Sequence, residues 1–225
     1  MIVLEKVSKA FKRRHGINQV LKDVDLTFAD GTRTAILGLN YSGKSTLINM
    51  MTGLLRPDRG RIYRSGKISY PINALSVVHA AMTVRQNISF LCQVYGFDPK
   101  PVQEFVESYT GLPRLMNEYV GNLVQSERLQ FVFTIGYALP FETYLIDGTY
   151  AGGPPAIRER ISKLMSTRME ESGLVLATKN SPTARAYCTR AIVLDGPKPH
   201  IYEDIEDGIA HYTDLVRKGR SAVAS

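Results

Sequence analysis

The chain has 225 residues, of which 44% are hydrophobic and 22% charged, a composition that can bury one sizeable core and excludes a disordered or fibrous protein. It contains no run of eighteen apolar residues and no basic segment followed by an apolar stretch at its N-terminus, so we expect neither a membrane span nor a secretory signal. The net charge of +7 indicates either attraction to an acidic partner or an ordinary solvated surface, and because only two short basic clusters stand out, at 12–14 and 217–220, we expect no nucleic-acid partner.

Strands and turns are predicted for the first part of the chain. Two apolar-rich runs, 21–28 and 32–39, flank a turn signal, and the polar segment 12–16 fits an exposed hairpin or loop. The short apolar run 34–39 is typical of a buried strand that leads into a phosphate loop. The spacing of apolar residues then predicts a helix over 45–55, which an Arg-Pro-Asp sequence stops.

Helices predominate in the middle of the chain and alternate with strands after it. Thr83 and Gln86 have the capping-box spacing that opens a helix, and Pro99 or Pro101 is expected to open another. The remaining predicted elements are a helix over 126–139, a helix over 155–169, and strands over 144–147, 174–177 and 191–194. This alternation predicts a parallel α/β core, and the tail from Arg217 is expected to fray.

Residues 38–46 match the phosphate-loop pattern Gly-x-x-x-x-Gly-Lys-Ser at every fixed position. The two glycines let the loop curl so that its backbone N–H groups point at phosphate oxygens, and Lys44 supplies a charge for the β- and γ-phosphates. Ser45 offers a hydroxyl to Mg²⁺, and the helix that begins near Lys44 adds the positive end of its dipole. The alternative is a chance match in a glycine-bearing turn, but the strand before the loop and the amphipathic helix after it favour a site for a nucleoside triphosphate and Mg²⁺. The predicted nucleotide-binding residues of the loop are Gly38, Asn40, Ser42, Gly43, Lys44, Ser45 and Thr46.

A phosphate loop also needs an acidic partner for Mg²⁺ at the end of a neighbouring strand. The apolar run 144–147 ends in Asp147, about a hundred residues after the loop. An aspartate in this place can instead be an ordinary turn residue, but the phosphate loop favours the metal role. We therefore predict Ser45 and Asp147 as the metal ligands.

With these motifs in place, the chain resembles the nucleotide-binding subunit of an ABC transporter, and most of all the subfamily that exports capsular polysaccharide and related cell-surface glycans. The resemblance runs from VSKAF at 7–11 to HYTDLV at 211–216. The stretches that carry it are LKDVDLTFADGTRTAILGLNYSGKSTLINMMTGLLRPDRGRI, KISYPINAL with MTVRQNISFLCQVYGF, TYLIDG and CTRAIVLDG. Phe11 lies where this family places an aromatic residue that stacks on adenine, although it can equally be a core residue of the first hairpin.

The resemblance implies a fold class and a domain organisation. The expected fold is α/β, a P-loop NTPase of the ABC-ATPase type with an N-terminal antiparallel β-subdomain, a RecA-like parallel-sheet core and a helical subdomain. Residues 1–225 would form a single nucleotide-binding domain, in which the helical subdomain occupies about 84–140.

Two segments depart from the family pattern in elements that sense nucleotide. His79 stands where the family has a glutamine that senses Mg²⁺ and the membrane partner, and a lone histidine in an apolar run is more often a packed or half-exposed residue than a ligand. The signature segment, which completes the ATP site of the partner subunit, has Asn122, Leu123 and Val124 where a serine and glycines belong. We expect the branched side chains to hinder close approach to phosphate and the signature hydroxyl to be missing.

Two further departures affect the groups that cleave ATP. Gly148 follows Asp147 where the family has a glutamate general base, and glycine offers no proton acceptor. Lys179 occupies the place of the switch histidine, and a lysine ammonium is only a donor. No catalytic residue is therefore assigned, since Gly148 and Lys179 occupy the two catalytic positions.

The resemblance implies an ATP-binding subunit of an exporter of capsular polysaccharide or a related glycan, which binds MgATP with impaired hydrolysis. Such a subunit would lie peripherally on the cytoplasmic face of the inner membrane, docked on a polytopic permease, and would pair with a second nucleotide-binding subunit as a homodimer or a heterodimer. The alternative function is a regulatory or scaffold protein that binds nucleotide without hydrolysing it, on a membrane or glycan-biosynthesis complex.

Overall fold

The computed structural model describes residues 1–13, 16–73, 77–111 and 113–221. The chain divides into two compact units. The first comprises Met1–Pro71, Glu142–Gly148 and Ser172–Ser225, and the second comprises Ile72–Phe141 and Thr149–Glu171. None of the helices in the described part of the chain has the length and apolar character that crossing a membrane requires.

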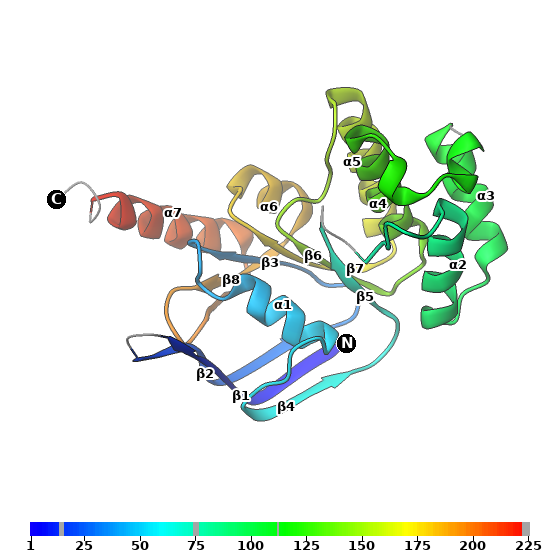
Figure 1. Ribbon diagram of the computed structural model, residues 1–225. Coiled ribbons are helices and arrows are strands. Elements are labelled where there is room, and N and C mark those ends of the chain that lie inside the picture. Colours follow the sequence, from blue (N-terminus) through cyan, green and yellow to red (C-terminus); the bar gives the residue numbers. More distant parts are fainter. Residues whose placement is uncertain (14–15, 74–76, 112, 222–225) are drawn as a thin grey trace. The chain divides into compact units, whose positions relative to one another are not determined.

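The first unit contains a three-stranded antiparallel sheet in the order β2-β1-β4 (Figure 1). Its strands are β1 (Ile2–Arg13), β2 (Gly16–Phe28) and β4 (Arg59–Arg64). The register shifts along β1, where Lys6 has a φ of 47°, so the side chains of this strand do not alternate regularly. The segment 12–16, predicted as an exposed hairpin or loop, joins β1 to β2, and its residues 14–15 lie outside the described residues.

A six-stranded sheet in the order β5-β6-β7-β3-β8-β9 forms the centre of the first unit. The strands are β3 (Arg33–Gly38), β5 (Ile68–Ile72), β6 (Thr143–Asp147), β7 (Gly173–Thr178), β8 (Arg190–Leu194) and β9 (His200–Tyr202). The strands β6, β7, β3 and β8 pair in parallel, whereas β9 runs antiparallel to β8. Their carboxyl ends therefore meet at one edge, which is where ligands bind in such sheets.

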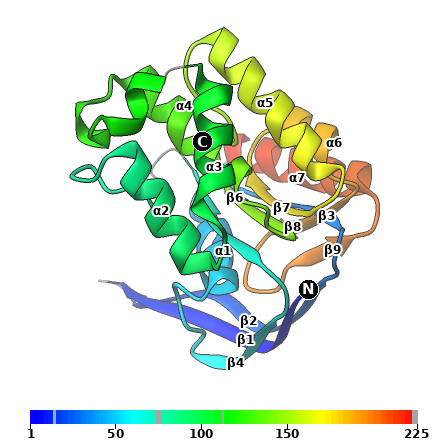
Figure 2. The same cartoon turned by 90° about the vertical axis from the view of Figure 1, so that its right-hand side faces the viewer.

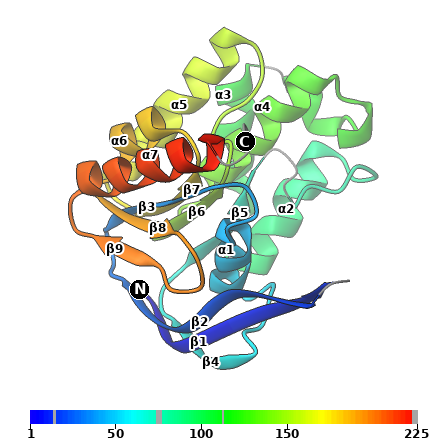
Figure 3. The same ribbon diagram turned by 90° about the vertical axis from the view of Figure 1, so that its left-hand side faces the viewer.

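Among its described residues, the first unit also contains the helices α1 (Lys44–Thr52), α6 (Ser181–Tyr187) and α7 (Ile205–Ser221). The apolar side chains of α1 lie in one buried cluster with those of both sheets, so α1 is held between the sheets (Figure 1). Leu47 and Ile48 are fully buried there, and each stabilises the fold by about 1.5–3 kcal/mol. The expectation of a frayed tail from Arg217 is wrong up to Ser221, because α7 packs on β8, β3 and β9 and continues to that residue (Figure 3).

The second unit consists of the helices α2 (Val84–Tyr95), α3 (Pro99–Thr110), α4 (Gln125–Ala138) and α5 (Pro155–Met169), together with two short 3-10 turns at Pro113–Asn117 and Val120–Asn122. The predicted capping box is confirmed, because the Thr83 hydroxyl accepts from the Gln86 N–H and the Gln86 side chain accepts from the Thr83 N–H. α3 packs on α2 and α4, and α4 packs on α5 (Figure 2). Residues Gln130–Ala138 of α4 are buried on all sides, so α4 is the central helix of this unit.

Candidate functional site

The phosphate loop lies between β3 and α1 and has the tight backbone that its sequence predicts. Gly43, the N-cap of α1, has a φ of 102°, a conformation that side chains other than glycine rarely adopt. A Cβ atom on Gly43 would collide with Cγ1 of Val20, and one on Gly38 would collide with Oγ of Ser42. Gly43 is therefore required both by its backbone conformation and by the close approach of Val20, whereas a side chain at Gly38 would have to displace the Ser42 hydroxyl.

Lys44 closes the loop on itself. Its Nζ donates to the carbonyl of Gly38 at 2.9 Å and to that of Leu39 at 2.7 Å, and it lies 3.4 Å from Oγ of Ser42. The pKa of Lys44 is lowered, first by burial and second by the positive charge of Lys179, while Asp147 raises it. The ammonium group therefore lies among loop atoms near a second positive charge, and an anionic ligand bound there would stabilise its charged form.

The edge of the sheet brings Asp147 towards the same loop. Asp147 ends β6 in register with Ala177 of β7, and Leu37 at the end of β3 is in register with Thr178. The effect of Asp147 on the pKa of Lys44 places its carboxylate within electrostatic reach of the loop. Ser45 is exposed in the first turn of α1, so a hydroxyl and a carboxylate are available as the hard oxygen ligands that Mg²⁺ prefers.

Gly148, directly after Asp147, gives the site no proton acceptor. Its N–H donates to the carbonyl of Ala177 at 2.8 Å, which fixes the backbone against β7. Its φ is 88°, and a Cβ atom added there would meet nothing within 4 Å. A side chain at this position would have room, but its backbone would be strained.

Lys179 is the first residue after β7, and its side chain reaches the phosphate loop. Its Nζ donates to Oδ1 of Asn40 at 3.1 Å, and its carbonyl accepts from the hydroxyl of Tyr212 at 3.2 Å. From the sequence, Lys179 is notable only because it occupies the position of the family's switch histidine. Its contact with a loop residue far away in the chain could not be read from the sequence, and it makes Lys179 a second cation of the site.

Phe11 lies on β1 opposite Asn18 and is 38% exposed, so it is not a core residue of the first hairpin. The Nζ atom of Lys9 lies 5.4 Å from the centroid of its ring. An exposed aromatic face remains available for a planar ligand, and stacking on adenine stays a prediction.

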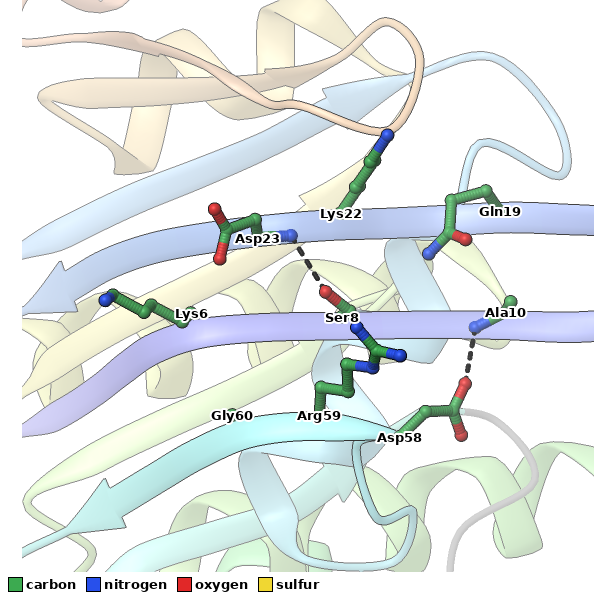
Figure 4. Close-up of a pocket in the computed structure, with 9 residues that line it drawn as sticks. All are labelled: Lys6, Ser8, Ala10, Gln19, Lys22, Asp23, Asp58, Arg59 and Gly60. Atoms are coloured by element: carbon green, nitrogen blue, oxygen red, sulfur yellow. Dashed lines mark hydrogen bonds between the residues drawn. The ribbon is translucent and has the colours of Figure 1, made fainter.

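The three-stranded sheet also bears a cavity of about 830 Å³ that the sequence did not indicate (Figure 4). Its lining residues are Lys6, Ser8, Ala10, Gln19, Lys22, Asp23, Asp58, Arg59 and Gly60. Two of its polar side chains bond within the sheet, since Asp58 accepts from the N–H of Ala10 at 2.7 Å and Ser8 accepts from the N–H of Asp23 at 2.9 Å. We therefore attribute these contacts to the irregular register of β1.

In the second unit, His79 belongs to a turn held by a buried asparagine. The side chain of Asn87, which is 1% exposed, accepts from the His79 N–H at 2.6 Å and donates to the His79 carbonyl at 3.1 Å. Nδ1 of His79 accepts from the N–H of Ala81 at 3.3 Å. These hydrogen bonds give His79 a structural part in the turn before α2.

The signature segment precedes α4, as the alignment of its residues requires, but its two branched side chains differ in exposure. Leu123 is 8% exposed and belongs to the core of the second unit. Val124 is the N-cap of α4, makes no side-chain capping hydrogen bond and is 60% exposed. The expectation that both side chains hinder close approach is therefore wrong for Leu123, which is buried, and stays a prediction for the exposed Val124.

Comparison with known proteins finds similarity to ATP-binding proteins of ABC transporters. The family model described as ABC transporter matches residues 21–173. The capsule polysaccharide export ATP-binding protein CtrD of Neisseria meningitidis is 28% identical over 96% of this chain and 100% of its own length. The polysialic acid transport ATP-binding protein KpsT of Escherichia coli is 28% identical over 94% and 96% of the two chains.

Solved structures agree in fold. The ATP-binding subunit of an ABC transporter superposes with a TM-score of 0.77 at 19% identity, covering 95% of this chain and 99% of that one. A dimeric ATP-binding cassette bound to ADP and phosphate superposes with a TM-score of 0.74 at 23% identity, covering 91% and 99%. These likenesses confirm the predicted α/β fold, with its antiparallel sheet and its parallel core.

Proposed function

Because the chain belongs to the ABC transporter family of ATP-binding domains, we propose that it is the ATP-binding subunit of an exporter of capsular polysaccharide or a related glycan, and that it binds MgATP but hydrolyses it slowly. The export substrate is proposed from the full-length similarity to CtrD and KpsT. The slow hydrolysis is proposed from this chain's own site, where the groups that hold a triphosphate are present and the groups that cleave it are replaced.

Binding of the triphosphate is assigned to the phosphate loop. Its N–H groups and the N-terminus of α1 would face the phosphate oxygens, with Lys44 on the β- and γ-phosphates. Ser45 and Asp147 would hold Mg²⁺, which neutralises phosphate charge when bound. The nearby Lys179 adds a positive charge to the same place, and Phe11 would stack on the base.

The observation that carries slow hydrolysis is that a glycine, Gly148, directly follows Asp147. The carboxylate that would accept a proton from the attacking water is missing, and the position is held in a left-handed conformation that favours glycine. Losing a general base costs about 10² to 10⁴ in rate, or about 2.7–5.4 kcal/mol in the barrier. Lys179 donates a hydrogen bond where the switch histidine is expected, and a charged lysine cannot accept one in return.

We place the protein on the cytoplasmic face of the inner membrane, docked peripherally on a polytopic permease and paired with a second nucleotide-binding subunit. In a homodimer, the signature segment with Val124 would complete both ATP sites. In a heterodimer with an intact partner, the partner's signature segment would complete the ATP site of this chain. The replaced base and switch also suit a regulatory or scaffold protein that uses ATP only to hold a conformation.

The proposal is tested by measuring MgATP affinity and turnover of the purified chain, alone and together with a candidate partner ATPase and permease. We expect MgATP binding by the chain alone, which Lys44→Ala weakens, and slow turnover that rises when an intact partner is added. Absence of MgATP binding would refute the ATP-binding function. Binding without association with a permease would instead favour the scaffold function.

A further inference from the structure

Three potential metal ligands meet at the turn between β8 and β9, and none of them belongs to the predicted ATP site. Asp195 directly follows β8, His200 begins β9 and His211 lies on α7. The nearest ligand atoms of the three side chains all lie within 4.8 Å of one another. Nε2 of His211 is 3.5 Å from Oδ2 of Asp195, and the two histidine rings lie edge to face with centroids 4.9 Å apart.

The local fold explains why the three side chains converge. Gly196, with a φ of 94°, follows Asp195 in the turn, and β9 then returns with His200 paired to Val193. On α7, a Cβ atom at Gly208 would collide with Cβ of Ala191, so the helix approaches β8 very closely at that point. His211 lies almost one turn further along α7, and its ring contacts the rings of His200 and Tyr202 on β9.

The orientation of His211 is fixed by a neighbour. The hydroxyl of Tyr202 lies 2.9 Å from Nδ1 of His211. Because Nδ1 makes this hydrogen bond, Nε2 is the nitrogen that faces Asp195. When Nδ1 carries the proton, the lone pair of Nε2 is available to a metal. A hydrogen bond of this kind to the second ring nitrogen is the usual support of a metal-binding histidine.

We propose that Asp195, His200 and His211 form a binding site for a divalent transition metal ion of the Zn²⁺ class. Imidazole nitrogen and carboxylate oxygen are ligands that suit Zn²⁺, and three protein ligands leave a fourth position for water. Ligand bonds of about 2.0–2.1 Å in a tetrahedral site place ligand atoms about 3.3 Å apart, close to the 3.5 Å between His211 and Asp195. His200 is exposed, and its ligand atom lies within 4.8 Å of those of Asp195 and His211, so its ring would have to approach them to complete the site.

A bound ion would join the β8–β9 hairpin to α7. Leu194, the residue before Asp195, is in register with Gly38, the first glycine of the phosphate loop. The metal would therefore brace the strand beside that loop. This inference concerns a separate set of ligands and does not depend on the proposed transport function.

The test uses the full-length protein without a histidine tag and without nucleotide. Zn²⁺ binding is measured by calorimetry, and Co²⁺ is added as a spectroscopic probe, because its visible absorption reports coordination number. We expect one site of tetrahedral type with no thiolate contribution, since the thiols of Cys92 and Cys188 are buried. His200→Asn and His211→Asn should each weaken Zn²⁺ binding at least tenfold, and Tyr202→Phe should weaken it about tenfold.

His79→Asn is the matched control, because it removes a histidine that lies in the second unit and should leave Zn²⁺ affinity unchanged. Thermal unfolding gives a second readout, in which Zn²⁺ raises the melting temperature of the wild type but not that of the double variant of His200 and His211. Asp195→Asn provides a variant with intact histidines should the double variant not fold. Wild-type Zn²⁺ affinity in the double variant or in Asp195→Asn, or no binding by the wild type, would overturn the proposal and leave an ordinary His211–Asp195 ion pair.

Discussion

Replacing Gly148 with glutamate tests whether the missing general base limits ATP cleavage. The position has room for a side chain, because a Cβ atom would meet nothing within 4 Å, but the φ of 88° costs about 1–2 kcal/mol for a residue with a Cβ atom. Gly148→Gln carries the same backbone strain and nearly the same shape without a carboxylate. The ratio of turnover between the glutamate and glutamine variants therefore isolates the contribution of the base.

A general base contributes about 10² to 10⁴ in rate, and the other altered groups act with it as a unit, so the full gain is not expected. We expect Gly148→Glu to hydrolyse ATP at least about tenfold faster than Gly148→Gln in a phosphate-release assay under saturating MgATP. Both variants should lose about 1–2 kcal/mol of unfolding free energy in urea. Equal turnover in the two variants would show that the absent carboxylate does not limit hydrolysis at this position.

Three other substitutions test groups of the structure described above. Lys44→Ala should weaken MgATP binding about 10- to 150-fold, since hydrogen bonds to charged groups contribute about 1.5–3 kcal/mol, and Lys44→Arg, measured beside it by equilibrium dialysis, should retain part of the affinity. Asn87→Ala should lower the unfolding free energy by about 2 kcal/mol or more, because the N–H and the carbonyl of His79 lose their buried hydrogen-bond partner. His79→Ala should lower it less. Equal losses of the two variants in denaturant titrations would show that these hydrogen bonds do not contribute as expected. Burial raises the pKa of Cys188 to about 12, above its value in the unfolded chain, so the folded state holds this proton more tightly. Stability should therefore fall as pH rises through about 9 to 12. Cys188→Ala should reduce this decline in thermal melts, and an unchanged dependence of melting temperature on pH would contradict the contribution of the buried thiol.

Local signals predicted most elements of the fold. The glycine and lysine pattern at 38–46 gave the phosphate loop, because its backbone conformation depends on residues next to each other in the chain. The capping box at Thr83 gave the start of α2 for the same reason. The helix predicted over 155–169 is α5 with the same bounds. Alternation of strands and helices was sufficient for the parallel core.

Contacts between distant segments could not be predicted in the same way. The sequence placed Lys179 at the position of a histidine, but its hydrogen bond to Asn40 depends on how β7 and β3 align. It treated Leu123 and Val124 alike, although the 3-10 turn before α4 directs one inward and leaves the other exposed. The convergence of His211 with the β8–β9 turn depends on the close packing of α7, which no local pattern shows.

The wild-type chain is proposed to bind MgATP firmly and to cleave it slowly. A single-turnover experiment with excess protein and radiolabelled ATP measures binding and cleavage in the same sample. We predict that ATP is bound by the chain and remains largely uncleaved, with a rate well below about 1 per second. Cleavage within the range of ordinary enzymes, about 1–10³ per second, would contradict it.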